Sequence, residues 1–595
     1  MAWQVFRLTC KRDIRYKFSI PRYSSIFSAY LSRYLSSIQE NEHGPLKASA
    51  GDKITGKVCF STLSYDLGQY SKFTNCLAIR SSRAREDLGA CESSSLVQAY
   101  WDRASISKGW VRPRKAHAAV SSPITKSRVF SSLGRSTSHH LERAQDLPTL
   151  EHEGKETVEA DILETQDGRI LYLGMTSSEL LYTLLNLQLV AYEPLVDLSI
   201  KLLKSPLMRF TVYRRPLLGI LKKTAYSHFC AGEDVAEASG TLKRMSELGL
   251  KSILDYSLED AIDNISCDNN LKGFLQTVHQ AREMSKQLVS FSCVKITALC
   301  PLPLLERISS LLRWQHMHPD FKLLWQEDVL PIFTDESPMY HVKSPPDPLT
   351  NQEEQHLTLA KDRLWKLCRA CDEAGLPLLI DAEYSSVQPA IDYYTYLAAL
   401  EFNRNGFPLV YGTVQAYLKD SLPRLSLAAI EAGKRQINFG VKLVRGAYIT
   451  RESALAASLG AESPVHSNIK KTHDCYDTCA AFMMQNAING RGAVVLATHN
   501  IDSGRAAAFK AQTLGLSKGN PRLQFAQLKG MADTLSLALV HAGFQVSKYL
   551  PFGPVGHVLP YLIRRAEENR GLLGNSLTDR SCIRNELKRR AHWQV

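Results

Sequence analysis

The chain has 595 residues, 44% of them hydrophobic, and a formal net charge of +13, so it is long enough for more than one domain and apolar enough for a large core. The charge is concentrated at one end, because residues 1–150 hold 23 Lys and Arg against 11 Asp and Glu, while the remaining 445 residues hold 49 against 48. A nearly neutral body argues against a nucleic-acid-binding protein, and the lack of a run of roughly 18 uncharged apolar residues argues against a membrane-spanning helix.

The N-terminal region has the composition of a targeting segment. The first 38 residues contain seven Lys or Arg and one acid, Asp13, among many Ser, Tyr and Phe. This is typical of a mitochondrial or plastid transit peptide, which we place at residues 1–40, and a basic tail without a targeting role is the alternative. Residues 41–165 are rich in Ser and Arg and weakly periodic, which predicts a largely disordered basic region. Helically spaced apolar residues then predict an N-terminal helical arm over 166–250.

Eight short apolar or β-branched runs alternate with helical stretches over residues 251–575. This alternation predicts an α/β fold, a (βα)8 TIM-type barrel followed by one final helix, with an open doubly wound sheet as the alternative. The expected strands are Ser252–Ser257, Ser292–Leu299, Pro377–Tyr384, Leu409–Tyr417, Asn438–Gly446, Ala493–Asn500, Arg522–Gly530 and Gln545–Phe552. Residues 300–376 exceed what one βα connection needs, which predicts an insertion that is helical at both ends. Residues 576–595 follow as a basic C-terminal tail.

Polar side chains stand near the carboxyl ends of most of these runs, where barrel enzymes build their active sites. A lone Lys or Asp at such a position is usually a surface or capping residue, but six of the eight runs carry a residue of this kind. These residues are Lys295, Asp381 with Glu383, Gln415, Lys442 with Arg445, Thr498 to Asn500, and Tyr549.

The final predicted helix carries polar groups at helical spacing. Tyr561, Arg564, Arg565 and Glu568 stand at i, i+3, i+4 and i+7, so they share one face. Two adjacent guanidinium groups can hold a carboxylate through paired hydrogen bonds. The face therefore predicts a clamp for a small amino or keto acid, and a solvated, salt-bridged face is the ordinary alternative.

The predicted site is basic but has no motif for a metal, a nucleophile or a Rossmann-bound dinucleotide. No GxGxxG follows a predicted strand, no GxxxxGK[ST] or HExxH occurs, and GLSKG (515–519), which fits GxSxG, precedes a predicted strand instead of following one. The Cys368–Cys371 and Cys475–Cys479 pairs lie in helical patterns and are interpreted as ordinary reduced thiols. We therefore expect the chemistry to belong to a bound organic cofactor.

Six ordered segments resemble proline dehydrogenase, a flavin-dependent mitochondrial family that also occurs as a domain of bifunctional bacterial proteins. The likeness spans about residues 220–575 and is carried by FCAGED (229–234), IDAEY (380–384), VQAY (414–417), LVRGAY (443–448), ATHN (497–500) and YLPFGPVGHVLPYLIRRAEEN (549–569). The resemblance implies a distorted barrel with FAD at the strand ends and the final helix over the barrel mouth. It also implies oxidation of L-proline to Δ1-pyrroline-5-carboxylate, the first step of proline catabolism to glutamate, with electrons passed to ubiquinone at the matrix side of the inner mitochondrial membrane.

The resemblance also implies roles for individual residues. Asp381 and Lys442 would be catalytic, and a cation such as Lys442 or Arg445 would stabilise the reduced flavin. The implied proline-binding residues are Lys295, Leu528, Tyr549, Tyr561, Arg564 and Arg565. The residues implied to bind FAD are Asp381, Ala382, Gln415, Lys442, Val444, Arg445, Gly446, Ala447, Tyr448, Thr498, His499, Asn500, Arg565 and Glu568.

Two other functions remain open from the sequence. Hydroxyproline dehydrogenase shares the implied fold but typically has a small residue where Tyr549 stands, so crowding of the 4-hydroxyl favours proline. A non-catalytic metabolite-binding barrel would not need intact Arg564, Arg565, Asp381 and Lys295. The tail from Arg580 to Trp593 is basic with apolar spots, which suits an anionic lipid surface or a frayed polar end.

Overall fold

The computed structural model describes Leu163, Thr165 and residues 167–284, 288–516, 518–571 and 573–592, without the side chains of residues 568–576 and 592. The predicted transit peptide lies outside these residues, as does nearly all of the predicted disordered region. Every described residue belongs to one unit of the chain, Pro148–Val595.

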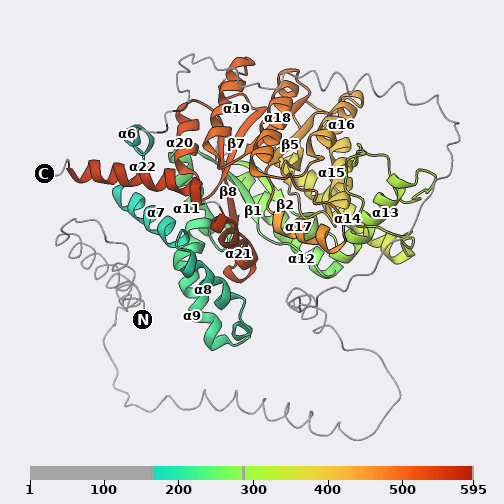
Figure 1. Ribbon diagram of the computed structural model, residues 1–595, viewed down its shortest axis with the longest axis horizontal. Helices are drawn as coiled ribbons and strands as arrows, with labels where there is room; N and C mark the ends of the chain where they lie inside the picture. Colours follow the sequence, from blue (N-terminus) through green and yellow to red (C-terminus); the bar gives the residue numbers. More distant parts are fainter. Residues whose placement is uncertain are drawn as a thin grey trace, which may run out of the picture. The chain divides into compact units, whose positions relative to one another are not determined.

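Eight parallel strands close into a barrel in sequential order (Figure 1). β1 pairs with both β2 and β8, which closes the ring and rules out the open doubly wound sheet. All eight predicted strands, and with them the predicted (βα)8 barrel, are confirmed. They are β1 (Lys251–Tyr256), β2 (Val289–Val294), β3 (Leu378–Ile380), β4 (Val410–Gln415), β5 (Phe439–Val444), β6 (Gly492–Ala497), β7 (Leu523–Leu528) and β8 (Val546–Phe552).

The second strand lies earlier in the chain than predicted. β2 ends at Val294, and Ile296–Ala298 form a short 3-10 turn, η3, whose side chains are all buried. The apolar residues of this turn extend the hydrophobic run of the strand, so the prediction, Ser292–Leu299, was shifted toward the C-terminus.

Helices alternate with the strands and surround the barrel (Figure 1). The long helix α14 shows why such segments begin and end where they do. Thr350 and Glu353 form a reciprocal capping box at its start, and Gly375, at φ 59°, ends it in the left-handed conformation. The helices from α12 to α20 are α12 (Asn264–Glu283), α13 (Leu302–Met317), α14 (Asn351–Ala374), α15 (Gln388–Phe402), α16 (Ser421–Lys434), α17 (Ile449–Ser458), α18 (Ile469–Ile488), α19 (Ile501–Thr513) and α20 (Asp533–His541).

The long β2–β3 connection contains two helices. α13 and α14 stand at its two ends, and residues 318–350, all of them described, form neither helix nor strand. These residues join the two helices, and Ser337 among them donates to Asp420, just before α16.

Helical segments precede the barrel and follow it. Before β1 come α6 (Gly168–Leu171), α7 (Ser177–Val190), α8 (Glu193–Leu203), η1 (Pro206–Arg209), α9 (Thr211–Leu221), the π-helical turn η2 (Lys222–Tyr226), α10 (Ser227–Phe229) and α11 (Val235–Glu247). After β8 come α21 (Val555–Gly571) and α22 (Leu573–His592). Figure 1 shows α7, α8 and α9 leaving one side of the barrel, with α22 lying across α7.

The basic C-terminal segment forms much of the packed helix α22. Ile583 is 1% exposed, and Glu586 accepts hydrogen bonds from Arg589 and Arg590. Arg590 also donates to backbone carbonyls of Tyr172 and Met175. These contacts tie α22 to the segment between α6 and α7.

Side chains fill the interior of the barrel, so we expect the functional site at one of its ends. Tyr549 of β8 packs at the edge of this inner cluster. Because all strands are parallel, their carboxyl ends meet at one end of the barrel. The fully buried inner cluster consists of Ile253, Phe291, Cys293, Leu379, Tyr411, Ala493, Val495 and Ala526.

Candidate active site

A buried group of charges lies at the carboxyl ends of β1, β2, β3, β5 and β8. Asp381, the first residue after β3, accepts a hydrogen bond from Lys442 and another from the Tyr549 hydroxyl at 2.8 Å. The Lys295 ammonium lies 3.8 Å from Asp381 and 3.7 Å from Asp255. Four of these five residues were predicted from the sequence, and the structure brings them together from strands far apart in the chain.

The electrostatics of this group favour a charged Asp381. Burial disfavours its ionised form, but the nearby Lys442 and Lys295 outweigh burial and lower its pKa to about 2. Burial likewise opposes the charged forms of both lysines, and the carboxylates raise their pKa values nonetheless. For Asp255, burial is the larger effect and raises the pKa. Lys295 and Lys442 are therefore permanent cations at neutral pH.

Arg445, directly after β5, is held by side chains of α18, of α19 and of the residue that follows β6. Its guanidinium donates to His473 Nδ1 at 2.9 Å, to Thr498 Oγ1 at 2.7 Å and to Ser503 Oγ at 2.5 Å. It also lies 4.2 Å from the ring centre of Tyr476. Such contacts fix a positive charge at the barrel mouth before any ligand arrives.

The turn after β5 depends on a glycine. Gly446 has φ 108°, and a Cβ added there would lie 1.9 Å from ring atoms of Tyr417, which is fully buried. A non-glycine residue would meet both backbone strain and a clash. The conformation of Gly446 determines how the chain leaves β5 toward Ala447 and Tyr448.

His499, after β6, is a neutral side chain in this structure. Its Nε2 accepts a hydrogen bond from the Leu528 backbone N–H at 3.0 Å. Burial and the neighbouring Arg565 lower its pKa to about 3. Its neighbour Asn500 caps α19 by accepting from the Ser503 N–H at 2.9 Å, so Thr498 to Asn500 have structural partners as well as predicted cofactor roles.

Gln415, at the end of β4, has a similar structural contact. Its side-chain amide donates to the Glu383 carbonyl at 2.8 Å. The Glu383 carboxylate in turn accepts from Thr297 Oγ1 at 2.9 and 3.1 Å. The predicted cofactor residues Ala382 and Val444 stand beside Asp381 and Arg445 in the chain, at the same end of the barrel.

The helix α21 brings its arginines to the barrel mouth. Arg564 forms a bidentate pair with Glu259 of the β1–α12 loop, at 2.5 and 3.0 Å. Arg565 lies with its guanidinium 5.4 Å from the ring centre of Tyr561. Its charge also lowers the pKa of His499, the second residue after β6. The side chain of Glu568, the acid expected to orient these arginines, lies outside the described residues.

Sequence reasoning missed several residues of this site. Asp255 and Glu259 stand at and just after the end of the first strand, in the segment SILDYSLED, so the rule used for the other strands would have found them. His473 and Ser503 lie on α18 and α19 and contact Arg445. Nothing in their local sequence patterns points to that contact.

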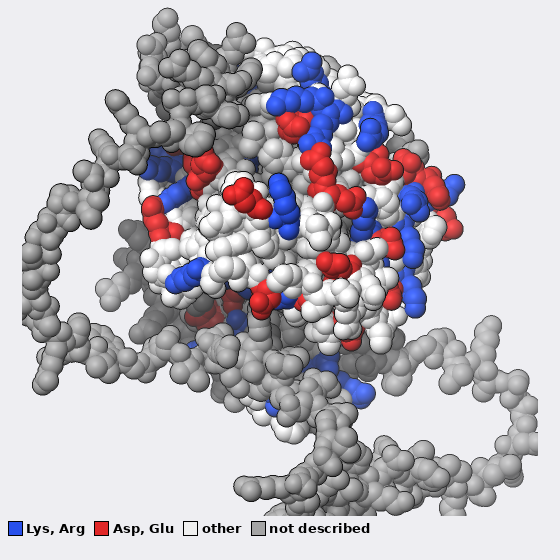
Figure 2. Space-filling model, turned by 90° about the vertical axis from the view of Figure 1, so that its right-hand side faces the viewer, with Lys and Arg blue, Asp and Glu red and all other residues white. Residues whose placement is uncertain are grey.

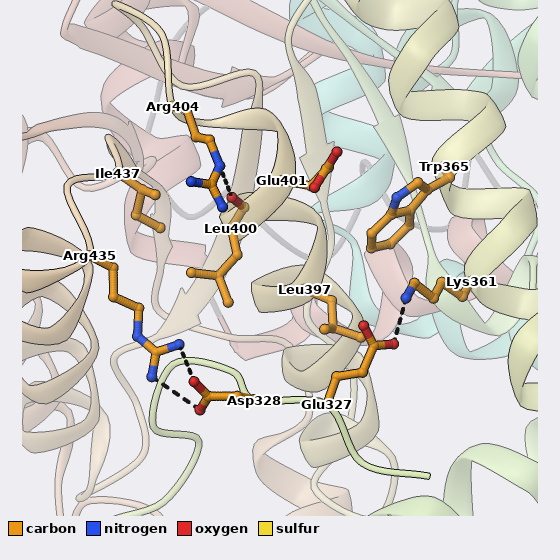
Figure 3. Close-up of a pocket in the computed structure, with 10 residues that line it drawn as sticks. All are labelled: Glu327, Asp328, Lys361, Trp365, Leu397, Leu400, Glu401, Arg404, Arg435 and Ile437. Carbon is orange, nitrogen blue, oxygen red and sulfur yellow. Dashed lines mark hydrogen bonds and ion pairs between the residues drawn. The ribbon is translucent and has the colours of Figure 1, made fainter.

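A separate pocket of about 480 Å³ lies outside this site (Figure 3). Its lining comes from α14, α15 and the segments next to them, on the side where α15 and α16 lead into the amino ends of β4 and β5. Lys361 pairs with Glu327 at 2.5 Å, and Arg435 pairs with Asp328 at 2.8 Å. Its charges therefore largely satisfy one another. The lining residues are Glu327, Asp328, Lys361, Trp365, Leu397, Leu400, Glu401, Arg404, Arg435 and Ile437.

Comparisons with known proteins agree on one family. Residues 238–576 match the family model for proline dehydrogenase. Mitochondrial proline dehydrogenase 1 of Arabidopsis thaliana is 47% identical over 446 residues, which cover 74% of this chain and 89% of that protein. Mitochondrial proline dehydrogenase 2 of the same plant is 49% identical and covers 72% and 90%. Human hydroxyproline dehydrogenase is 32% identical and covers 71% and 93%.

A solved structure of proline utilization A from Bdellovibrio bacteriovorus, inactivated by N-propargylglycine, also aligns with this chain. The TM-score is 0.48 and the identity 20%, over 73% of this chain and 40% of that one. This chain therefore spans less than half the length of that protein.

Proposed function

The chain belongs to the proline dehydrogenase family, and from this premise we propose that it oxidises L-proline to Δ1-pyrroline-5-carboxylate, using FAD as hydride acceptor and passing the electrons to ubiquinone. The observation that carries the proposal is the meeting of two sets of residues at one barrel mouth. One set is the arginine pair of α21, and the other is the Asp381 group at the strand ends. Glu259 links the two sets, because it pairs with Arg564 and the charge of Lys295 lowers its pKa.

Arg565 and Arg564 would bind the substrate carboxylate. A charged hydrogen bond of this kind contributes roughly 1.5–3 kcal/mol. Arg564 already has Glu259 as a bidentate partner, so an incoming carboxylate would share that guanidinium or displace Glu259. Tyr549 and Tyr561 would lie against the apolar face of the proline ring, with Leu528 on the side of β7.

The residues at the strand ends fit a flavin. Arg445 is a fixed cation, Gly446 allows the turn after β5 to pack against Tyr417, and His499 is uncharged. FAD would supply the acceptor for the hydride that leaves proline C5. Lys442 and Arg445 would provide positive charge where negative charge develops, without reorganising during the reaction.

Asp381 would act by positioning. Its low pKa keeps it ionised at neutral pH, so it holds Lys442, Lys295 and Tyr549 in place. The Tyr549 ring, fixed by this bond, supports proline rather than its 4-hydroxylated analogue as the substrate. A mitochondrial location, at the matrix side of the inner membrane, is part of the proposal, because the Arabidopsis relatives are named mitochondrial.

The test is an anaerobic visible spectrum of the purified protein before and after addition of L-proline. We expect an oxidised flavin band near 450 nm, about where flavins in general absorb, that bleaches with proline. Bleaching with trans-4-hydroxyproline alone would reassign the substrate. A protein that cannot take up FAD would overturn the proposal and leave a binding role for the barrel.

A further inference from the structure

The helices before the barrel include a projecting segment with apolar residues on its surface. We call residues 193–221, which contain α8, η1 and α9, the helical hairpin. No side chain of η1 or α9, all of which the structure describes, is buried. Leu207 is 49% exposed, Phe210 64%, Val212 90% and Ile220 63%. Figure 1 shows α8 and α9 pointing away from the barrel.

The helical hairpin and the residues that follow it are basic, and beyond Asp197 they carry no acid before Glu233. Between Asp197 and Glu233 the sequence has seven Lys or Arg and no Asp or Glu. Lys204 pairs with Glu567 of α21 at 2.8 Å, and Lys222 pairs with Glu233. The face at the right-hand side of the molecule differs, because Figure 2 shows positive and negative side chains intermingled there. The seven basic residues are Lys201, Lys204, Arg209, Arg214, Arg215, Lys222 and Lys223.

An element that lies in an anionic lipid interface typically combines exposed apolar side chains such as Leu, Val and Phe with neighbouring Lys and Arg and few acidic residues. Among the helices that the structure describes, none is long and apolar enough to cross a membrane. We propose that the helical hairpin docks the protein on an anionic membrane surface, with Leu207, Phe210 and Val212 entering the acyl boundary and the basic side chains among the headgroups.

The C-terminal helix α22 is also basic, and two of its arginines are paired inside the fold. Arg589 and Arg590 both pair with the buried Glu586, and Arg590 also bonds to carbonyls of the α6–α7 segment. Ile583 faces the core. Leu207, Phe210 and Val212 of the hairpin, by contrast, are open to solvent.

The hairpin also adjoins the helix that carries the arginine pair. Leu218 and Leu221 of α9 pack against a cluster that contains Val558, Tyr561 and Leu562 of α21. Docking at the hairpin would therefore hold the barrel mouth close to the lipid phase. This part of the inference rests on the proposed function, since it gives a lipid-dissolved quinone a short path to the electron donor.

The experiment is flotation of the holoenzyme with vesicles of phosphatidylcholine, with and without cardiolipin. We expect the wild-type protein to bind the anionic vesicles. The triple substitution Leu207→Ser, Phe210→Ser and Val212→Ser should weaken this binding about tenfold or more, because exposed apolar area is lost. The matched control is Ile265→Ser, Leu324→Ser and Ile469→Ser, three residues that are 73%, 97% and 65% exposed elsewhere. The double substitution Arg215→Gln and Lys223→Gln tests the basic side chains, and it should weaken binding to the anionic vesicles.

A hairpin variant that binds as tightly as the control variant would overturn the proposal. Equal binding of the wild-type protein to neutral vesicles would overturn its electrostatic part. Proline oxidation with a soluble dye, measured on the same preparations, tests the proposed function separately. We expect it to be unchanged in the hairpin variant, and its absence from the wild-type protein would refute the dehydrogenase but not the docking surface.

Discussion

The two arginines of α21 differ in what they already contact. Arg564 is paired with Glu259, whereas the Arg565 guanidinium lies 5.4 Å from the ring centre of Tyr561 and its charge lowers the pKa of His499. We predict that Arg565→Met raises the KM for proline about tenfold to a hundredfold, the loss of one charged hydrogen bond, while flavin remains bound. Steady-state kinetics and the flavin-to-protein ratio measure both. Arg584→Met on the outer face of α22 is the control, and an unchanged KM in Arg565→Met would contradict the clamp.

The buried carboxyl group of Glu383 should make the stability of the folded protein depend on pH. It is 2% exposed, and burial together with repulsion from Asp260 raises its pKa to about 8. A carboxyl whose folded pKa is raised contributes full stability below its unfolded pKa of about 4.3, and loses that contribution as pH rises through 8. Glu383→Gln should therefore reduce the stability lost between pH 5.5 and 8 by on the order of 2 kcal/mol. Chemical denaturation at both pH values measures this.

The control for that prediction is Glu373→Gln, at an exposed position of α14. Its stability should follow the wild-type protein at both pH values. A Glu383→Gln variant with the same pH dependence as the wild type would show that Glu383 is already ionised in the folded state at pH 5.5.

Residue-level contacts of the site could be predicted only in part. Asp381, Lys442 and Lys295 stand at strand ends, and the barrel rule alone brings them together. The Arg564–Glu259 pair joins residues 305 positions apart. The sequence spacing on α21 pointed instead to Glu568, because helical periodicity relates only residues on one helix. Loop geometry, which places Glu259 under α21, has no such periodic signal.

At the scale of elements, the turn after β5 is constrained both by its backbone conformation and by the packing of Tyr417. Gly446→Ala would add a Cβ 1.9 Å from the Tyr417 ring at φ 108°. We predict a loss of stability of about 3 kcal/mol or more, since both overpacking and backbone strain are imposed. Thermal unfolding and flavin content would report it.

Gly490→Ala separates the two contributions. Gly490 has φ 70°, but an added Cβ would have nothing within 4 Å. Gly490→Ala should lower the free energy of unfolding by about 1 kcal/mol, because only the backbone conformation is penalised. Equal losses in the two variants would mean that Tyr417 moves aside freely, contrary to its complete burial.

Strands were predictable where the sequence pattern changes sharply. Polar or glycine residues flank β5, β6 and β8 on both sides, and the predicted bounds of these strands lie close to those observed. β2 was shifted because η3 carries Ile296, Thr297 and Ala298 into the core as a strand would. Hydrophobic periodicity reports burial more directly than backbone conformation.

At the scale of the whole molecule, α22 joins the helical arm to the barrel. Asp579 accepts a hydrogen bond from the Thr534 N–H of α20, and Ile583 packs in the main core. We predict that Ile583→Asp lowers the melting temperature by several degrees, because an unpaired charge would replace a buried side chain. Thermal unfolding measures this, and Arg584→Asp, exposed on the next position, should change it little. A minor effect of Ile583→Asp would show that α22 can detach without cost.

The continuity of β8 with α21 has a consequence for how new substrate preferences could arise. Tyr549, Tyr561, Arg564 and Arg565 all lie within residues 546–571, one uninterrupted stretch, whereas Arg445, Thr498 and His499 come from other strands. Most of the proposed amino-acid contacts and most of the proposed cofactor contacts are thus encoded by separable parts of the gene. A single crossover cassette spanning this stretch could exchange substrate choice among homologues, provided that Val558 and Leu562 keep their contacts with the hairpin base.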